Sequence, residues 1–335
     1  MEIDYIFETN RSIQDNLVRI DTAKGIIAFL PQLPHVEALL RHKSLLKSSL
    51  FSARIEGNGL GLDEIDYEQK GTEDRENREV VNILRALEWI YSQDASLGMT
   101  VDLILELHKL VLQDLSSDAG RLRTEPSAIF NQAGIAVYMP PPPSMVKKLL
   151  MQLVGLHRNK ASAAFDAEHG VIKAAFAHFT FEKIHPFIDG NGRVGRLLST
   201  FLLKNAGYDF RGLATFEEYL NEHRDEYYAA LSISGKDITE FVEFFTTAVA
   251  VSAEKVIEML KEKKEEKPED SLLPRRQEIL AIIREHNLVS FDFIRRRFAR
   301  VPESSLHYDL KMLLKASFIK KLGSTRGVLY RIIQE

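Results

Sequence analysis

The stretch HPFIDGNGRVGR, from His185 to Arg196, gathers one histidine, one aspartate, one asparagine, two arginines and four glycine or proline residues. Within and after it, apolar residues recur at the spacing of one helical face: Val194, Leu197, Leu198, Phe201 and Leu202. Gly207 follows where such a helix would end. The pattern predicts a glycine-rich turn that opens directly onto the N-terminus of an amphipathic helix.

This turn has the features of a phosphate-binding site. A helix N-terminus presents unpaired backbone N–H groups and a partial positive charge. Gly190 and Gly192 lack Cβ atoms, which leaves room for an anion beside the backbone. Arg193 and Arg196, three residues apart, add paired donors that suit phosphate oxygens. We therefore expect these four residues to bind phosphate groups.

Two more side chains of the stretch indicate catalysis. Asp189 is a hard carboxylate, and one carboxylate together with substrate phosphates is the usual way in which proteins hold Mg²⁺. His185 is suited to act as a general base near neutral pH. Each feature alone has a plainer explanation, because histidines before proline, Gly-Asn-Gly turns and solvated arginine pairs are common. Their coincidence in one turn favours a polyphosphate–Mg²⁺ site with a base beside it.

Most of the remaining chain has helical periodicity, so we expect a mainly α fold. Apolar spacing predicts helices over residues 77–91, 101–112, 145–158 and 170–184. The segment 121–140 differs, because β-branched and aromatic residues flank a glycine-containing turn, which predicts a β-hairpin. Four prolines at 140–143 end this hairpin.

The composition of the 335-residue chain is that of an ordinary globular protein, with 45% hydrophobic and 27% charged residues. The absence of cysteine excludes disulfides and thiolate metal sites and is compatible with a reducing compartment. The acidic N-terminus, MEIDYIFETN, lacks an apolar signal core. No apolar run reaches the roughly 18 residues that span a bilayer. We therefore expect a cytoplasmic protein without a membrane partner.

Charge divides the chain into two parts. Residues 271–335 hold 13 Lys and Arg against 6 Asp and Glu, whereas the whole chain has a net charge of −4. A basic tail therefore follows an acidic body, and the charged run KEKKEEKPEDS (residues 261–271) predicts the linker between them. Within the tail we expect three helices followed by two strands, an order that resembles a winged helix.

In a winged helix the third helix enters the DNA major groove and the wing contacts phosphates. Arg326 would be the wing contact, and the exposed readers on the third helix would be Ser304, Ser305, His307, Tyr308 and Lys311. Asp309 lies within that helix, and Arg295–Arg297 lie on the second helix instead. Because winged helices also serve as protein-interaction modules, DNA binding through residues 273–335 is one of two equal alternatives.

The opening stretch matches the signature HxFx[D/E]GNGRxxR of the Fic (filamentation induced by cAMP) family without a departure: His185, Phe187, Asp189, Gly190, Asn191, Gly192, Arg193 and Arg196. The segments FEKIHPF, AGRLRTE and RDEYYAAL also resemble Fic proteins that carry an N-terminal extension and a C-terminal winged helix. The resemblance implies a helical core with a β-hairpin flap. It also implies transfer of AMP from ATP to a Ser, Thr or Tyr hydroxyl of a target protein and of the enzyme itself.

The resemblance further implies a role for each residue of the stretch. His185 would deprotonate the target hydroxyl, Asp189 would hold Mg²⁺ at the α- and β-phosphates, and Phe187 would anchor the loop. Arg193 would hold the β-phosphate and Arg196 the γ-phosphate. The full set of residues that would contact the phosphates of ATP is Gly190, Asn191, Gly192, Arg193, Gly195 and Arg196.

By the same resemblance the hairpin would be a flap that receives the target by strand addition near Ile129 or Phe130. The residues alone leave a plain surface hairpin as an equal alternative. Tyr227 and Tyr228 would lie on the adenine side of the site, and Thr180 would also line it. Only one of two adjacent helical residues can face a given direction, so a core position is the alternative for each tyrosine.

A second stretch, SSLFSARIEGN (residues 48–58), matches the inhibitory motif [S/T]xxxE[G/N] of regulated Fic proteins at Ser52, Glu56 and Gly57. Four residues make about one helical turn, so Ser52 and Glu56 share a face, and Gly57 ends the helix. The resemblance implies that Glu56 pairs with Arg196 and misplaces the phosphates of ATP. Glu56 could also position a water for removal of AMP, which would make the protein bifunctional.

We expect a helical extension over residues 1–95 that includes an inhibitory helix at 44–57, a catalytic core at 96–260, a charged linker at 261–272 and a winged-helix-like domain at 273–335. The leading hypothesis is a self-inhibited protein adenylyltransferase that uses ATP and Mg²⁺. One alternative is a DNA-binding regulator whose Fic core senses a nucleotide. Another is a Fic transferase of a different phosphate-containing group. A homodimer, common in the family, is left open.

Overall fold

The computed structural model describes residues 3–32, 34–65, 74–94, 97–130, 136–158, 169–262, 269, 272–323 and 328–333. The chain forms two compact units, of which the first joins Met1–Asn58 with Asn82–Glu262 and the second joins Gly59–Val81 with Lys263–Glu335. The first helices pack directly on later helices of the first unit, and the boundary between an N-terminal extension and the core stays a prediction.

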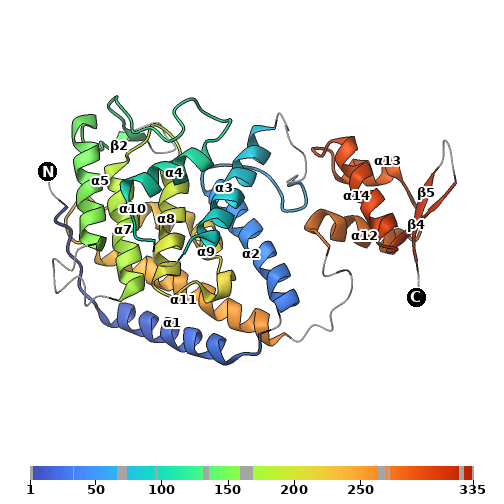
Figure 1. Cartoon of the computed structure of the whole chain (residues 1–335), viewed down its shortest axis with the longest axis horizontal. Helices are drawn as coiled ribbons and strands as arrows, with labels where there is room; N and C mark the ends of the chain where they lie inside the picture. Colours follow the sequence, from blue (N-terminus) through green and yellow to red (C-terminus); the bar gives the residue numbers. More distant parts are fainter. Residues whose placement is uncertain are drawn as a thin grey trace. The chain divides into compact units, whose positions relative to one another are not determined.

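The first unit is almost entirely helical, which confirms the expected fold class (Figure 1). The four helices predicted from apolar spacing form, and their ends differ by at most two residues from the prediction. The expected inhibitory helix at 44–57 is the C-terminal part of a longer helix that begins at residue 34. One helix, α3 (Arg75–Ser92), begins in the second unit and continues into the first. The other elements are α1 (Arg11–Phe29), α2 (Pro34–Ile55), α4 (Val101–Val111), β1 (Ile129–Phe130), β2 (Ala136–Tyr138), α5 (Pro143–Arg158), α7 (Gly170–Ile184), α8 (Asn191–Asn205), η1 (Phe210–Gly212), α9 (Phe216–Glu222), α10 (Arg224–Leu231) and α11 (Thr239–Lys261).

Helix α7 forms the core of the first unit and packs against α5, α8 and α11 (Figure 1). All its residues from Val171 to Ile184 except Lys173 are buried, as expected for a helix that is apolar on every side. Helix α8 follows after a short turn and packs most extensively on α7. This buried pair of helices therefore fixes the position of the glycine-rich turn at residues 185–190.

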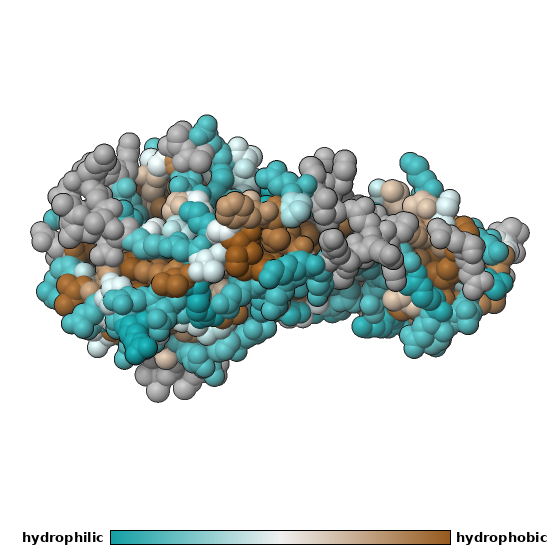
Figure 2. Space-filling model, turned by 90° about the horizontal axis from the view of Figure 1, so that it is seen from below, coloured by the Kyte–Doolittle hydropathy of each residue, from teal (hydrophilic) through white to brown (hydrophobic). Residues whose placement is uncertain are grey.

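Helix α1 packs along α11 and buries Ile13 and Ile20 (Figure 1). On the face that carries α1, hydrophobic residues reach the surface among hydrophilic ones (Figure 2). The exposed apolar side chains of α1 include Val18, Ile26 and Phe29, and such scattered exposure is ordinary for a soluble fold. Within the described ranges, no helix combines the length and the apolar character that a bilayer crossing requires.

The predicted hairpin is present as a short antiparallel pair, β1 and β2, with Ile129 opposite Tyr138. Residues 121–128 form no strand, so the paired part is smaller than the predicted segment. Residues 131–135, where a turn is predicted, lie outside the described residues.

The described C-terminal part of the second unit, residues 272–323 and 328–333, forms helices and an antiparallel sheet with strand order β3-β5-β4. The expected helices and two strands are found, whereas the two-residue strand β3 was not predicted. The elements are α12 (Pro274–His286), β3 (Val289–Ser290), α13 (Phe291–Arg297), α14 (Glu303–Lys315), β4 (Ile319–Leu322) and β5 (Leu329–Ile332). Arg326 and most of the predicted linker lie outside the described residues.

Helix α14 carries the residues predicted to read DNA, and its buried face differs from the prediction. Asp309 is 1% exposed and accepts hydrogen bonds from Arg275 Nε (2.5 Å) and Arg276 Nε (2.8 Å). Ser305 is also buried, so its assignment as an exposed reader is wrong. The other four predicted readers are exposed: Ser304, His307, Tyr308 and Lys311.

Candidate active site

The turn between α7 and α8 holds the predicted base, and its backbone is strained. His185 ends α7 in the left-handed conformation, with φ 49° and ψ 62°, which costs a residue with a Cβ atom about 1–2 kcal/mol. Gly190 has φ 83°, where the missing Cβ removes this cost. Such a strained conformation persists only where surrounding contacts hold it. The contacts of the turn therefore fix the position of His185.

Asn191 closes the turn with both ends of its carboxamide. Its Oδ1 accepts a hydrogen bond from the backbone N–H of Phe187 (2.9 Å), and its Nδ2 donates to the backbone oxygen of Phe187 (2.9 Å). The side chain of Asn191 is buried. The carboxamide thus shapes the loop, and its contact with a phosphate stays a prediction.

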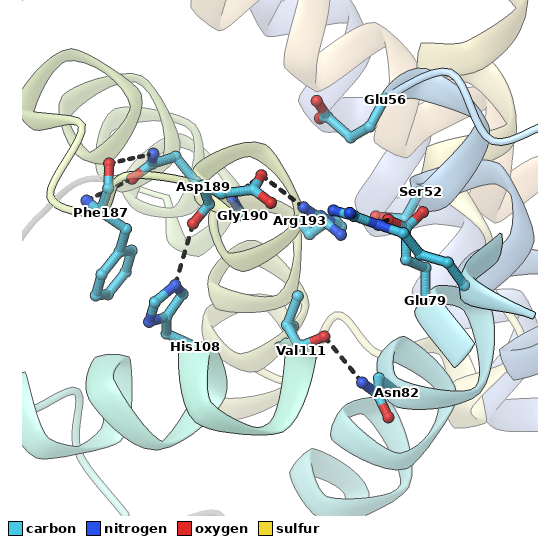
Figure 3. Close-up of polar contacts among 12 residues, drawn as sticks. Ser52, Glu56, Glu79, Asn82, His108, Val111, Phe187, Asp189, Gly190 and Arg193 are labelled. Atoms are coloured by element: carbon cyan, nitrogen blue, oxygen red, sulfur yellow. Dashed lines mark hydrogen bonds and ion pairs between the residues drawn. The ribbon is translucent and has the colours of Figure 1, made fainter. Parts of the chain in front are cut away.

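His108 of α4 contacts the turn, and the sequence analysis does not predict this contact. Its ring stacks on Phe187 with centroids 3.6 Å apart. Nδ1 accepts a hydrogen bond from the backbone N–H of Gly120 (3.0 Å), so Nε2 carries the proton and donates to the backbone oxygen of Asp189 (3.1 Å; Figure 3). Burial lowers the pKa of His108 to about 4, which keeps the ring neutral and this tautomer in place.

Asp189 is the carboxylate of the site. Its Oδ1 accepts hydrogen bonds from the backbone N–H of Gly190 (2.6 Å) and from Nη2 of Arg193 (2.8 Å; Figure 3). The side chain of Asp189 is 51% exposed, whereas that of Arg193 is 5% exposed. Within the described residues no group of three or more acidic, His or Cys side chains could hold a metal ion. A metal here would therefore depend on Asp189 and on oxygens of a bound ligand, which suits Mg²⁺.

Glu56 pairs with Arg196, as the motif predicts. Arg196 Nη2 donates to Glu56 Oε1 (2.8 Å) and to the backbone oxygen of Ser52 (2.9 Å), and Arg196 Nε donates to Ser52 Oγ (2.9 Å). Arg196 is 1% exposed. Burial is the largest single influence and lowers the pKa of Arg196, but the charge and hydrogen bond of Glu56, together with Tyr227 and Tyr228, raise the pKa above its usual value. The pair is therefore a buried cation held by one carboxylate.

The Glu56 carboxylate also touches the first turn of α8. A Cβ atom added at Gly192 would overlap Glu56 Oε1, so the glycine is needed for this close approach. Glu56 lies just past the end of α2, and Gly57 turns the chain away with φ 99°. A helix N-terminus attracts anions. Glu56 thus stands where an anionic ligand of Gly192 and Arg196 would bind.

Gly195 faces the core instead of the predicted phosphates. A Cβ atom at this position would overlap Glu182 Oε1 of α7. Burial raises the pKa of Glu182 to about 8. The assignment of Gly195 to phosphate binding is therefore corrected: its missing side chain makes room for a buried carboxyl group between α7 and α8.

The predicted adenine-side residues are divided by burial. Tyr227 is 1% exposed and donates from its hydroxyl to His178 Nε2 (2.8 Å) inside the core, so its assignment to ATP is corrected. Thr180 is 1% exposed and is likewise a core residue. Tyr228 is 40% exposed and donates to the backbone oxygen of Ile55 (3.1 Å), at the end of α2 next to Glu56. Of these three residues, Tyr228 is the one that remains a candidate contact for the adenine of ATP.

The flap residues lie on the hairpin as predicted, with Ile129 on β1 half-buried and Phe130 beside it. Their contact with a target stays a prediction. The hairpin is joined to α7 by Arg123, whose guanidinium donates to the backbone oxygen of His185 (2.7 Å). Arg123 lies in the segment AGRLRTE, but nothing in the sequence pattern indicates this contact.

We expect the pKa of His185 to lie far below its usual value. Burial lowers the pKa of His185 to about 4, so the ring is a neutral proton acceptor throughout the range above pH 5. Because folded His185 binds a proton more weakly than unfolded histidine, it lowers the free energy of unfolding as the pH falls below about 6.5. An NMR titration of its ring protons, assigned with the His185→Ala variant, measures this pKa. An inflection near 6.5 would contradict the burial argument.

Residues 98–203 match the Fic/DOC family model. The chain is 29% identical over 245 residues to the protein adenylyltransferase fic-1 of Caenorhabditis briggsae, an alignment that covers 68% of this chain and 45% of that protein. It is 32% identical over 187 residues to the protein adenylyltransferase Fic of Drosophila persimilis, covering 55% of this chain and 33% of that protein. The chain thus spans about half or less of the length of these curated relatives.

Solved structures agree in fold. A Fic family protein from Desulfovibrio desulfuricans G20 aligns with a TM-score of 0.65 at 23% identity, covering 100% of this chain and 99% of that chain. Fic-1 (residues 134–508) of Caenorhabditis elegans aligns with a TM-score of 0.60 at 23% identity, covering 75% of this chain and 74% of that chain. Residues 98–203, which hold the intact motif from His185 to Arg196, are thus the part of this chain that matches a Fic domain.

Proposed function

We propose that this protein is a self-inhibited protein adenylyltransferase, which transfers AMP from ATP to hydroxyl groups of a target protein and of itself. The observation that carries the proposal is the Glu56 carboxylate, which fills an anion site formed by Arg196 and the first turn of α8. The activity named for the relatives supports the same reaction.

The chemistry follows from the residues around this site. His185 accepts the proton of the target hydroxyl, the oxygen attacks the α-phosphorus of ATP, and the bond from that phosphorus to the pyrophosphate oxygen breaks. The N–H groups at the start of α8 and the guanidinium groups of Arg193 and Arg196 balance the charge of the phosphates. Glu56 forms an ion pair with Arg196. The terminal phosphate of ATP therefore cannot bind Arg196, and the α-phosphate is misplaced.

We propose Mg²⁺ as the cofactor and Asp189 as its protein ligand. Asp189 is a single, half-exposed carboxylate beside the helix N-terminus, and Mg²⁺ commonly takes one or two carboxylates together with substrate phosphates. When bound, Mg²⁺ would neutralise phosphate charge. Arg193 holds one oxygen of Asp189 and so orients the carboxylate.

ATP labelled in either the α- or the γ-phosphate tests the reaction. Adenylyl transfer puts only the α-label on the protein, and EDTA abolishes the labelling. A γ-label on the protein would instead indicate transfer of a different phosphate-containing group. If the Glu56→Gly variant binds ATP but takes up neither label, with or without candidate targets, the Fic core is a nucleotide sensor and the proposal is wrong.

We propose as a second function that the second unit is a winged helix that binds DNA through α14. The supporting observation is Asp309, whose charge is buried against Arg275 and Arg276, so it does not oppose DNA phosphates at the exposed face. We expect the full chain to retain duplex DNA at low salt, to release it as salt rises, and to bind more weakly after Lys311→Ala. No retention at low salt would exclude DNA as the partner.

A further inference from the structure

Arg123 is a buried cation whose side-chain partners, within the described residues, are backbone carbonyl oxygens. It is 3% exposed. Its Nε donates to His185 O (2.7 Å), and its Nη2 donates to Ile184 O (3.4 Å). Nη1 donates to Glu125 O (3.2 Å) and Nη2 also to Pro141 O. A guanidinium group with this burial normally pairs with a carboxylate, so the arrangement calls for a specific explanation.

One side of this contact set caps the C-terminus of α7. The carbonyls of Lys183, Ile184, His185 and Pro186 are consecutive, and each accepts a hydrogen bond from the hairpin segment. Tyr138 Oη donates to the first (3.0 Å), the Arg123 side chain to the second and third, and the Arg123 backbone N–H to the fourth (3.0 Å). The last carbonyls of a helix have no partner within it, so these bonds fix the end of α7.

The other side of the contact set closes the base of the hairpin. Glu125 precedes β1 and Pro141 follows β2, and the same guanidinium group binds the carbonyl oxygens of both. Tyr138, at the end of β2, adds a second connection because its ring lies 4.4 Å from the ammonium group of Lys183. The hairpin and the strained residue His185 are thus held by one side chain.

We propose that Arg123 is a positioning residue that holds the base, His185, at a fixed place relative to the hairpin on which the target segment would lie. This inference rests on the proposed function. A target strand paired with the hairpin brings its hydroxyl to a place set by Glu125 and Pro141. The same guanidinium group also sets the place of His185. The distance between the base and the target hydroxyl is therefore fixed directly, and not through the residues that lie between Arg123 and His185 in the chain.

The test uses Arg123→Lys in the full chain carrying Glu56→Gly. Lysine keeps the charge but loses the planar fork that reaches several carbonyls at once. We expect kcat for AMP transfer to fall about 10²-fold, the scale of a misplacement of about 1 Å, while KM for ATP stays within about twofold. The control is Arg121→Lys, an exposed residue of the same segment, which should change neither. An unchanged kcat in Arg123→Lys would overturn the proposal. So would a fall in kcat accompanied by a comparable loss of ATP affinity and a lower melting temperature.

A second variant separates positioning from a merely structural role. The charge of Arg123 helps, after burial, to lower the pKa of His185, so Arg123→Gln should raise that pKa in an NMR titration and Arg123→Lys should not. Because this measurement needs no turnover, it tests the positioning role of Arg123 separately from the proposed AMP transfer. If the Glu56→Gly parent transfers no AMP, the proposed function fails. If the His185 resonances are the same in Arg123→Gln and parent, the link through Arg123 fails.

Discussion

Replacing Glu56 by glycine is expected to raise the rate of self-modification with ATP and Mg²⁺ by about 10²-fold. The carboxylate of Glu56 holds Arg196 at 2.8 Å and touches Gly192 at the start of α8. Its removal leaves a buried, uncompensated guanidinium group, which favours binding of a phosphate in its place. Intact-mass measurement of AMP incorporation against time gives the rate.

Two variants that each remove one carboxylate charge provide the controls for this prediction. Glu56→Gln keeps the size of the side chain but loses its charge, so we expect a rate between those of the unmodified protein and Glu56→Gly. Glu88→Gln makes the same change at an exposed position of α3 and should leave the rate unchanged. Equal rates for Glu56→Gly and the unmodified protein would show that the ion pair with Arg196 does not restrain the reaction.

His185→Ala in the Glu56→Gly background is expected to slow AMP transfer by about 10²–10⁴-fold, the usual contribution of a general base. The ring of His185 is the neutral proton acceptor of the turn, whereas His108 uses both ring nitrogens to hold the backbone. Affinity for ATP should stay within about twofold, because the groups proposed to bind its phosphates lie on α8. Single-turnover rates and calorimetric ATP binding measure the two quantities.

The matched control for His185 is His286→Ala, an exposed histidine of the second unit. It should change neither the rate nor ATP binding. If His185→Ala loses ATP affinity to the same extent as rate, the residue holds the loop and another group takes the proton. If it keeps the rate, the assignment of the base is wrong.

The local elements could be predicted because their signals are local. The apolar face of α8 and the helical runs of α4 and α7 all depend on residues within one or two turns of each other. Pairing of Glu56 with Arg196, 140 positions apart, came from a family motif. Periodicity carries no information about such distant contacts.

The failures at the site share one cause. Tyr227 and Tyr228 are neighbours in one helix, yet one is buried against His178 and the other is 40% exposed. Gly195 lies one residue before Arg196 but packs on Glu182. Which direction a helical residue faces is set by how its helix packs on the others, and the spacing of residues along α8 or α10 does not show which neighbour covers each face.

The sequence by itself determined the helical class, the glycine-rich turn at the start of α8 and the chemistry that this turn can perform, because backbone preference and side-chain type are properties of short segments. Only the tertiary structure decided how the turn is held and restrained. Asn191 closes it, His108 and Arg123 bind its carbonyls, and Glu56 pairs with Arg196. Most of these contacts join segments that are far apart in the chain and are brought together by burial of α7 and α8.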